Sequence, residues 1–118
     1  MDSLVKTIGY LVHQNPLLTQ TMLEWSMADN IWLRRVAILN QLGLKEATNQ
    51  ELLQKTIQNN FGQSEFFINK AIGWALRDYA KTNPEWVLAF VNQHRTKFSS
   101  LSWREATKHL TNTTQFHS

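Results

Sequence analysis

Apolar residues recur at spacings of three and four along almost the whole chain. That spacing places them on one side of an α-helix, whereas a strand needs sustained alternation at a spacing of two, which this sequence lacks. The pattern predicts an all-α chain of about seven short helices. Their apolar stripes, in chain order, are Leu4, Ile8, Leu11 and Val12; Leu18, Met22 and Trp25; Leu33, Val36, Ala37 and Leu39; Leu52, Leu53 and Ile57; Phe67, Ile68, Ala71, Ile72, Ala75, Leu76 and Tyr79; Trp86, Val87, Phe90 and Val91; and Ala106 and Leu110.

Polar residues and glycines mark the expected helix ends, because short polar side chains cap helix starts and glycine tolerates the left-handed turn after a helix. Asn-Pro pairs put a cap just before a proline at the first helical position. The predicted starts are Asn15-Pro16, Asp29 or Asn30, Ser64 for the longest helix, Asn83-Pro84, and the capping boxes Thr48-x-x-Glu51 and Ser102-x-x-Glu105, and the predicted stops are Gly43 and Gly62.

An internal repeat appears at a period of 35 residues. Placing Ile31, Phe66 and Leu101 in register also aligns two further triplets, which are Leu33, Ile68 and Trp103, and Val36, Ala71 and Ala106. Each register starts one helix. A helix pair that cannot bury its apolar face alone must stack on its neighbours, so the repeat predicts an α–α superhelix, a HEAT-like solenoid. We place the repeat domain at residues 1–110 and a polar tail at 111–118.

Charge is distributed unevenly along the 118 residues, which carry a formal net charge of +3. Residues 1–33 contain one base against three acids, and residues 34–118 contain eleven bases against six acids. A basic region of this kind suits a phosphate backbone or an acidic partner, and is equally common as a solubility feature. The absence of cysteine excludes thiol catalysis and cysteine-based zinc sites.

One helix carries an aromatic residue among cations on the side away from its core stripe. Lys70, Trp74, Arg77 and Lys81 fall at i, i+4, i+7 and i+11. Either Trp74 packs against the neighbouring repeat beside ordinary solvated bases, or it is an aromatic platform framed by phosphate contacts.

A second aromatic and basic cluster lies one repeat earlier, at Trp32-Leu33-Arg34-Arg35. Arg35 aligns with Lys70 in the repeat register. Two parallel helices with a cation at the same register would form a basic stripe along one surface, although arginine and lysine stems also cover apolar surface routinely.

The segments FFINKAIGWALRDYAKTNPEWV (66–87) and DNIWLRRVAILNQL (29–42), with SWREATKHL near the C-terminus and DSLV at 2–5, resemble the AlkD-type DNA alkylation-repair glycosylases, a HEAT-like repeat family. The resemblance runs from Asp2 to about Leu110 and covers the C-terminal half of the family's length. The first cleft tryptophan of the family pattern has no counterpart in this sequence.

The resemblance implies excision of positively charged alkylated purines from duplex DNA, without a cofactor. It assigns the catalytic carboxylate to Asp2, a DNA-contacting arginine to Arg35, a cleft tryptophan to Trp74 and a further basic contact to Arg77. Lys70, Lys81 and Arg34 join the candidate DNA-binding set from their spacing. A first-turn acid on the opening helix is the alternative role for Asp2.

We expect the chain alone to bind the DNA backbone with little or no glycosylase activity, and the alternative is a non-catalytic HEAT-repeat scaffold for protein interactions. An uncapped first helix would expose apolar surface and favour self-association there. The four histidines show no metal-ligand spacing, so no metal site is expected. No apolar run approaches the ~18–20 residues of a membrane span, and the opening residues lack signal-peptide features, so we expect a cytoplasmic protein.

Overall fold

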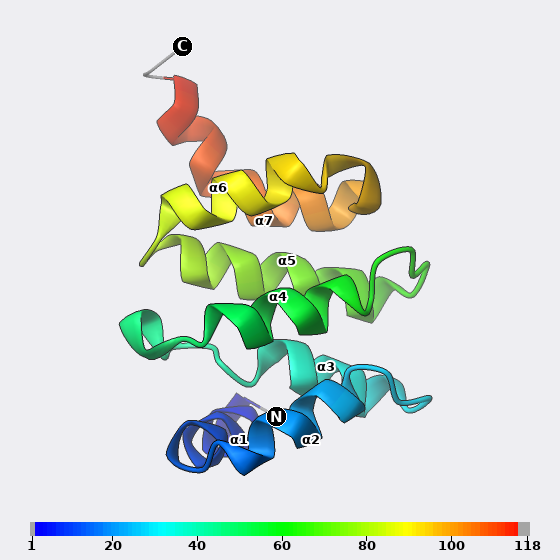
Figure 1. Ribbon diagram of the computed structural model, residues 1–118. Coiled ribbons are helices and arrows are strands. Elements are labelled where there is room, and N and C mark those ends of the chain that lie inside the picture. Colours follow the sequence, from blue (N-terminus) through cyan, green and yellow to red (C-terminus); the bar gives the residue numbers. More distant parts are fainter. Residues whose placement is uncertain (1, 116–118) are drawn as a thin grey trace.

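Seven α-helices stack into a superhelix in this computed structural model, which describes the backbone of residues 2–115 and the side chains of 4–108 and 110 (Figure 1). The described residues contain no strand, so the predicted fold class is confirmed. The helices are α1 (Asp2–Gln14), α2 (Leu17–Trp25), α3 (Ile31–Leu39), α4 (Gln50–Gln58), α5 (Phe66–Ala80), α6 (Pro84–Gln93) and α7 (Ser100–Gln115), with single 3₁₀ turns at Lys45–Ala47 and Arg95–Lys97. Helix α7 continues past residue 110, the predicted end of the repeat domain. That domain boundary stays a prediction.

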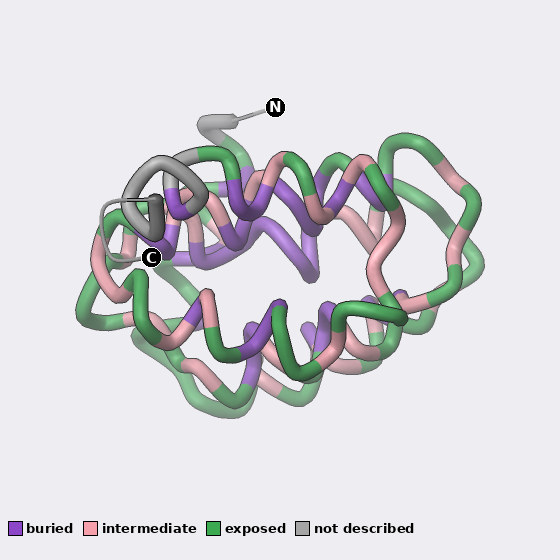
Figure 2. Tube along the Cα trace, turned by 90° about the horizontal axis from the view of Figure 1, so that it is seen from above, coloured by how far each residue is buried: buried purple, intermediate pink, exposed green. Residues whose placement is uncertain are grey.

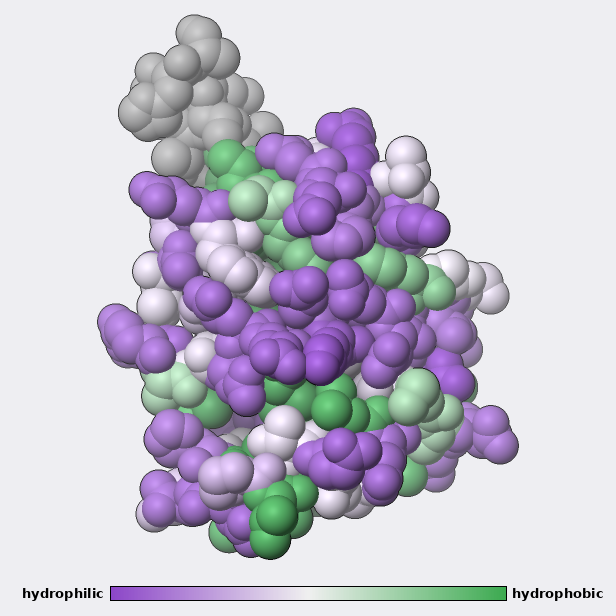
Figure 3. Space-filling model, in the orientation of Figure 1, coloured by the Kyte–Doolittle hydropathy of each residue, from purple (hydrophilic) through white to green (hydrophobic). Residues whose placement is uncertain are grey.

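The helices form two layers with the core between them (Figure 2). Helices α1, α3, α5 and α7 make the inner layer, in which α5 packs on both α3 and α7, and α2, α4 and α6 make the outer layer. Fully buried aliphatic side chains from both layers fill the interior, among them Ile57, Ile68, Leu76 and Val87. Viewed from the outer layer, the surface over α4 is hydrophilic (Figure 3).

The 35-residue period is present in the structure. Helices α3 and α5 begin at the predicted Ile31 and Phe66, and α7 begins at Ser100, one residue before the predicted register. Polar groups link successive repeats at or near this separation: the Gly43 N–H donates to Asp78 Oδ2 at 3.0 Å, 35 residues away, and Asn60 Nδ2 donates to the Ser26 carbonyl at 2.9 Å, 34 residues away. One of these hydrogen bonds joins two successive helices of the inner layer, and the other joins the ends of two successive helices of the outer layer.

Asparagines cap the helices largely as predicted. Asn30 and Asn83 accept hydrogen bonds from the N–H groups of Leu33 and Trp86 and cap α3 and α6. The predicted start of α2 is one residue early: Asn15 Oδ1 accepts the Leu17 N–H, but Pro16 is the N-cap residue and Leu17 begins the helix. Gly43 and Gly62 both adopt φ of +82°, a conformation that glycine favours, at the end of the turns that follow α3 and α4. As helix stops they are predicted too late, because the helices end at Leu39 and Gln58 and their C-caps are Asn40 and Asn59.

Three further predicted starts are wrong by a short distance. Thr48 donates its N–H to the preceding 3₁₀ turn, so the chain enters α4 one residue later and Asn49 is the cap. Glu65, not Ser64, caps α5, and α7, at 16 residues, is longer than α5. Ser102 lies inside α7, where its buried hydroxyl faces α5, and Ser99 accepts the hydrogen bond from the Ser102 N–H instead.

The stripe predicted for the first helix is partly wrong. Leu4 and Leu11 are 49% and 52% exposed, whereas Val5 and Val12, on the neighbouring side of α1, are buried. The reason is that α1 packs against other helices on one side only among the described residues, so its second apolar row has no cover.

Two glycines set how closely the inner helices approach. A Cβ atom at Gly9 of α1 would lie 1.7 Å from the Asn40 carbonyl oxygen, just after α3. A Cβ atom at Gly73 of α5 would lie 2.4 Å from Glu105 Cβ on α7. Neither separation is sterically possible, so only glycine allows these helix crossings.

Substituting Gly73→Ala tests this packing. Alanine normally stabilises a helix interior by about 1 kcal/mol relative to glycine. Here we expect a net loss of about 1–3 kcal/mol because the new methyl group forces α7 away from α5. Urea unfolding measures the change, with the exposed Ala89→Gly in α6 giving the propensity effect alone. A Gly73→Ala protein more stable than the parent would contradict the close approach.

Candidate nucleic-acid interface

The α5 stripe predicted from spacing lies on the face of the inner layer that points away from the core. Lys70 and Lys81 are exposed, whereas Arg77 and Trp74 are half-buried. The indole is therefore neither free in solvent nor enclosed in the core, although it packs against core residues along one side. The stripe presents one aromatic surface among three cations.

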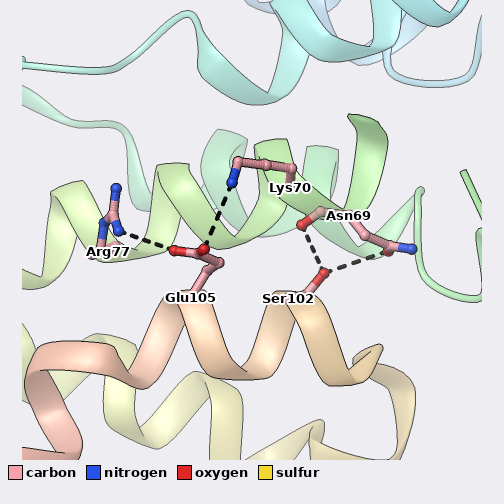
Figure 4. Close-up of polar contacts among 5 residues, drawn as sticks. All are labelled: Asn69, Lys70, Arg77, Ser102 and Glu105. Carbon is pink, nitrogen blue, oxygen red and sulfur yellow. Dashed lines mark hydrogen bonds and ion pairs between the residues drawn. The ribbon is translucent and has the colours of Figure 1, made fainter. Parts of the chain in front are cut away.

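A single carboxylate from α7 holds two of these cations (Figure 4). Glu105 Oε2 accepts a hydrogen bond from Arg77 Nη1 at 2.9 Å, and Glu105 Oε1 lies 3.7 Å from Lys70 Nζ. The Glu105 side chain is 23% exposed, compared with 53% for Lys70. The carboxylate thus bridges two cations that lie about two helical turns apart on α5, and it reduces the combined charge of the group from +2 to +1.

Gly73 makes this arrangement possible. It lies between Lys70 and Arg77 on the α7 side of α5, and the absence of a side chain lets the Glu105 stem lie against the α5 backbone. One turn earlier, the Ser102 hydroxyl donates to the Asn69 carbonyl at 2.8 Å and fixes the same crossing (Figure 4). The position of the carboxylate is therefore set by backbone contacts.

Trp74 leans the other way, toward α1 and the end of α3. It lines a small open hollow of about 170 Å³ together with Lys6, Leu42, Gly43 and Asp78. The Asp78 carboxylate accepts the Gly43 N–H, so this acid also secures the turn after α3. The hollow thus combines an indole, a lysine and a carboxylate.

Asp2, the predicted catalytic residue, begins α1 one turn before Lys6. Its side chain lies outside the described residues, so its role stays a prediction. Lys6, which follows it by four residues, borders the hollow beside Trp74.

Arg35 lies on α3 and reaches the start of α5. Its guanidinium carbon is 5.3 Å from the centre of the Phe67 ring, in cation–π geometry. The Nε atom is buried without a hydrogen-bond partner among the described residues. None of the described contacts joins Arg35 to Trp74 or Arg77, so the structure brings these three onto one layer without grouping them around one cavity.

Arg34 has an internal role. Its Nε donates to the Ala28 carbonyl, and its Nη1 lies 3.3 Å from Asn60 Oδ1, after α4. The side chain therefore ties the α2–α3 connection to the next repeat, and these donors are already used within the fold.

An exposed aromatic edge, which the apolar pattern did not predict, lies at the start of α5. Phe67, predicted in the core stripe, is 53% exposed, as is Phe66, and the two rings pack edge to face at 5.3 Å. Lys70 Nζ lies 5.9 Å from the Phe66 ring centre, and Trp32 at the start of α3 is also exposed. The signal was two adjacent phenylalanines directly after a helix cap, where both cannot point into the core.

Two features are absent from the described residues. They contain no group of three or more histidine or acidic side chains placed to hold a metal ion. None of their helices has both the length and the apolar character needed to cross a bilayer.

The sequence matches the model of the family described as DNA alkylation repair enzyme over residues 1–110. The chain belongs to this family. A solved structure described as a predicted DNA alkylation repair enzyme from Enterococcus faecalis superposes with a TM-score of 0.81 at 44% sequence identity. That match covers 92% of this chain and 51% of the relative, so the chain spans about half of the relative's length. A comparison with curated proteins finds no match.

Proposed function

We propose that this DNA alkylation repair family member binds the sugar–phosphate backbone of duplex DNA through the inner layer, as part of a glycosylase that excises positively charged alkylated purines. The half-buried indole of Trp74, flanked on one helix face by Lys70, Arg77 and Lys81, is the observation that carries the proposal. Arg35 and the Phe66–Phe67 edge extend the same layer onto α3 and the start of α5.

The physical chemistry of DNA favours such a surface. Most of the affinity of nonspecific DNA binding comes from lysine and arginine residues that displace counterions from phosphates. Arginine contacts phosphate with two parallel hydrogen bonds, and exposed aromatic rings stack on base faces without sequence preference. Glu105 keeps Arg77 and Lys70 oriented and partly neutralised until phosphate competes for them.

The proposed reaction needs few catalytic groups from the protein. An alkylated purine that carries positive charge leaves with the electrons of the C1′–N bond as a neutral base, so no general acid is needed. Asp2 would stabilise the positive charge that develops on the sugar and accept a proton from the water whose oxygen bonds to C1′. The Trp74 face would attract the cationic lesion, an effect of about 1–2 kcal/mol when desolvated.

DNA binding gives the first test. Anisotropy of a labelled duplex should show affinity that falls steeply with salt, by a slope of about −0.9 per phosphate neutralised. Arg35→Ala should weaken binding by about three- to tenfold, whereas the matched loss of charge in Lys55→Ala, on the outer layer, should have little effect. Glu105→Gln should strengthen binding, and Glu51→Gln, which also removes a lysine-paired carboxylate, should not.

Equal effects from the inner-layer and outer-layer variants would mean that only net charge matters. Salt-independent or undetectable binding would remove the DNA-binding proposal altogether.

Base release gives the second test. Because the sequence spans half of the solved relative's length, we expect slow release of methylated purine from methylated duplex, visible only with protein in excess. Asp2→Asn should abolish this release without changing DNA affinity. Asp78→Asn is the control, because its amide oxygen can still accept the Gly43 N–H in the same hollow. Loss of release in the Asp78 variant and not in the Asp2 variant would reverse the assignment.

An interaction role is the second candidate, and the exposed apolar row of α1 favours it. Leu4 and Leu11 lie seven residues apart on one side of the helix, and Leu17, at the same end of the stack, is 81% exposed. At the opposite end, Arg104 and Lys108 of α7 are exposed instead. An exposed apolar row of this kind marks a contact surface, so we propose that this side of α1 associates with a second copy of the chain.

Sedimentation measures this association. The apparent mass should rise with concentration, Leu11→Glu should restore the monomer, and Met27→Glu, at an exposed methionine in the α2–α3 connection, should not. A monomer at high concentration for the unmodified chain would exclude the interface.

A further inference from the structure

Two cation–aromatic pairs lie at the start of α5, and a third lies at the start of α7. Arg35 on α3 lies over Phe67, Lys70 on α5 lies over Phe66, and Arg95, just before α7, lies over Trp103. The α2–α3, α4–α5 and α6–α7 connections all lie along one edge of the stack (Figure 1). The first two pairs belong to the surface described above, but the third does not.

The third pair borders its own hollow. Arg95, Phe98, Trp103 and Arg104 line an open depression of about 330 Å³ at the junction of α6 and α7. The Arg95 guanidinium carbon lies 4.1 Å from the Trp103 ring centre, the shortest of the three cation–π separations. Stacking on the indole limits the rotamers of Arg95 while its N–H groups stay available around the ring edge.

The charge of this hollow is uncompensated. Arg95 and Arg104, which line the hollow, are exposed, and so is Lys97 in the 3₁₀ turn beside it. None of the three forms an ion pair with a described residue. Lys70 and Arg77 share Glu105, so they contribute one net charge between them. The α6–α7 junction therefore carries three cations without an ion pair to a described residue, whereas two of the three cations in the α5 stripe share Glu105.

The hollow is also continuous with that stripe. Arg104 borders a second depression, of about 340 Å³, together with Leu101, Glu105 and Lys108. Since Glu105 contacts both Lys70 and Arg77, a line of cations runs from α5 across α7 to Arg95. A bound backbone following the inner layer would reach this junction next.

We propose that the hollow formed by Arg95, Trp103 and Arg104 is a phosphate-binding subsite that extends the DNA contact surface onto α7. This inference rests on the proposed DNA binding. The two guanidinium groups would donate to the nonbridging oxygens of one backbone phosphate, and the exposed part of the indole would contact the adjacent sugar. Nothing in this contact reads base identity, so it adds affinity and register without sequence preference.

The experiment compares salt-dependent duplex binding of the parent chain with Arg104→Ala, Arg95→Ala and the double variant. Each single change should weaken binding about three- to tenfold and reduce the magnitude of the salt slope by about one. Arg95→Lys, which keeps the charge and loses the planar stack, should fall between the parent and Arg95→Ala. Lys55→Ala is the matched control, and thermal unfolding of Arg104→Ala, whose side chain is exposed, should be unchanged.

Each other outcome overturns the inference. If the parent binds DNA and Arg35→Ala weakens binding while the α7 variants do not, the subsite is wrong and the proposed function stands. If the parent does not bind DNA, the proposed function fails. If tripolyphosphate stabilises the parent and not Arg104→Ala while DNA affinity is unaffected, the hollow takes a free phosphate compound. If Arg95→Ala only causes self-association, the arginine is a solubilising cap.

Discussion

The close approach of α5 to α7 at Gly73 determines where the charges of the inner layer lie. With any larger residue at this crossing the two helices would separate, and Glu105 would lose its position between Arg77 and Lys70. The Ser102 hydroxyl, buried at the same crossing, can donate to the Asn69 carbonyl only at this helix spacing. The small size of Gly73 thus determines where the charges of Glu105, Arg77 and Lys70 lie. The contact with DNA that we propose depends on this arrangement.

The architecture could be predicted from sequence because its determinants are local or periodic. Spacings of three and four, asparagines before helices, and glycines after them act within a few residues, and the 35-residue register repeats the same solution. The errors occur where tertiary contacts decide. Ser102 has the spacing of a cap, but α5 lies beside it and takes its hydroxyl, so Ser99 caps α7. Phe67 fits the apolar period of α5, yet it lies at the end of the helix where no layer covers it.

The candidate site was predictable in its residue types and only partly in its arrangement. Helical periodicity correctly places Lys70, Trp74 and Arg77 on one side of α5, because that relation is internal to one helix. Periodicity contains no information about a carboxylate 28 residues beyond Arg77, so the Glu105 contact was not foreseen. Arg34 and Arg35 are neighbours in sequence but diverge, one to the α2–α3 connection and the other to Phe67, because successive helical positions lie about 100° apart.

The difference between the two ends of the stack constrains how copies of this chain could assemble. Leucines are exposed at the α1 end, and arginine and lysine at the α7 end, so the two ends do not complement each other. A head-to-tail contact repeats without limit and forms fibres, whereas a contact between identical surfaces closes after two copies. Association through α1 would therefore produce a two-fold symmetric pair and stop, leaving the basic edges at the distal ends of the pair.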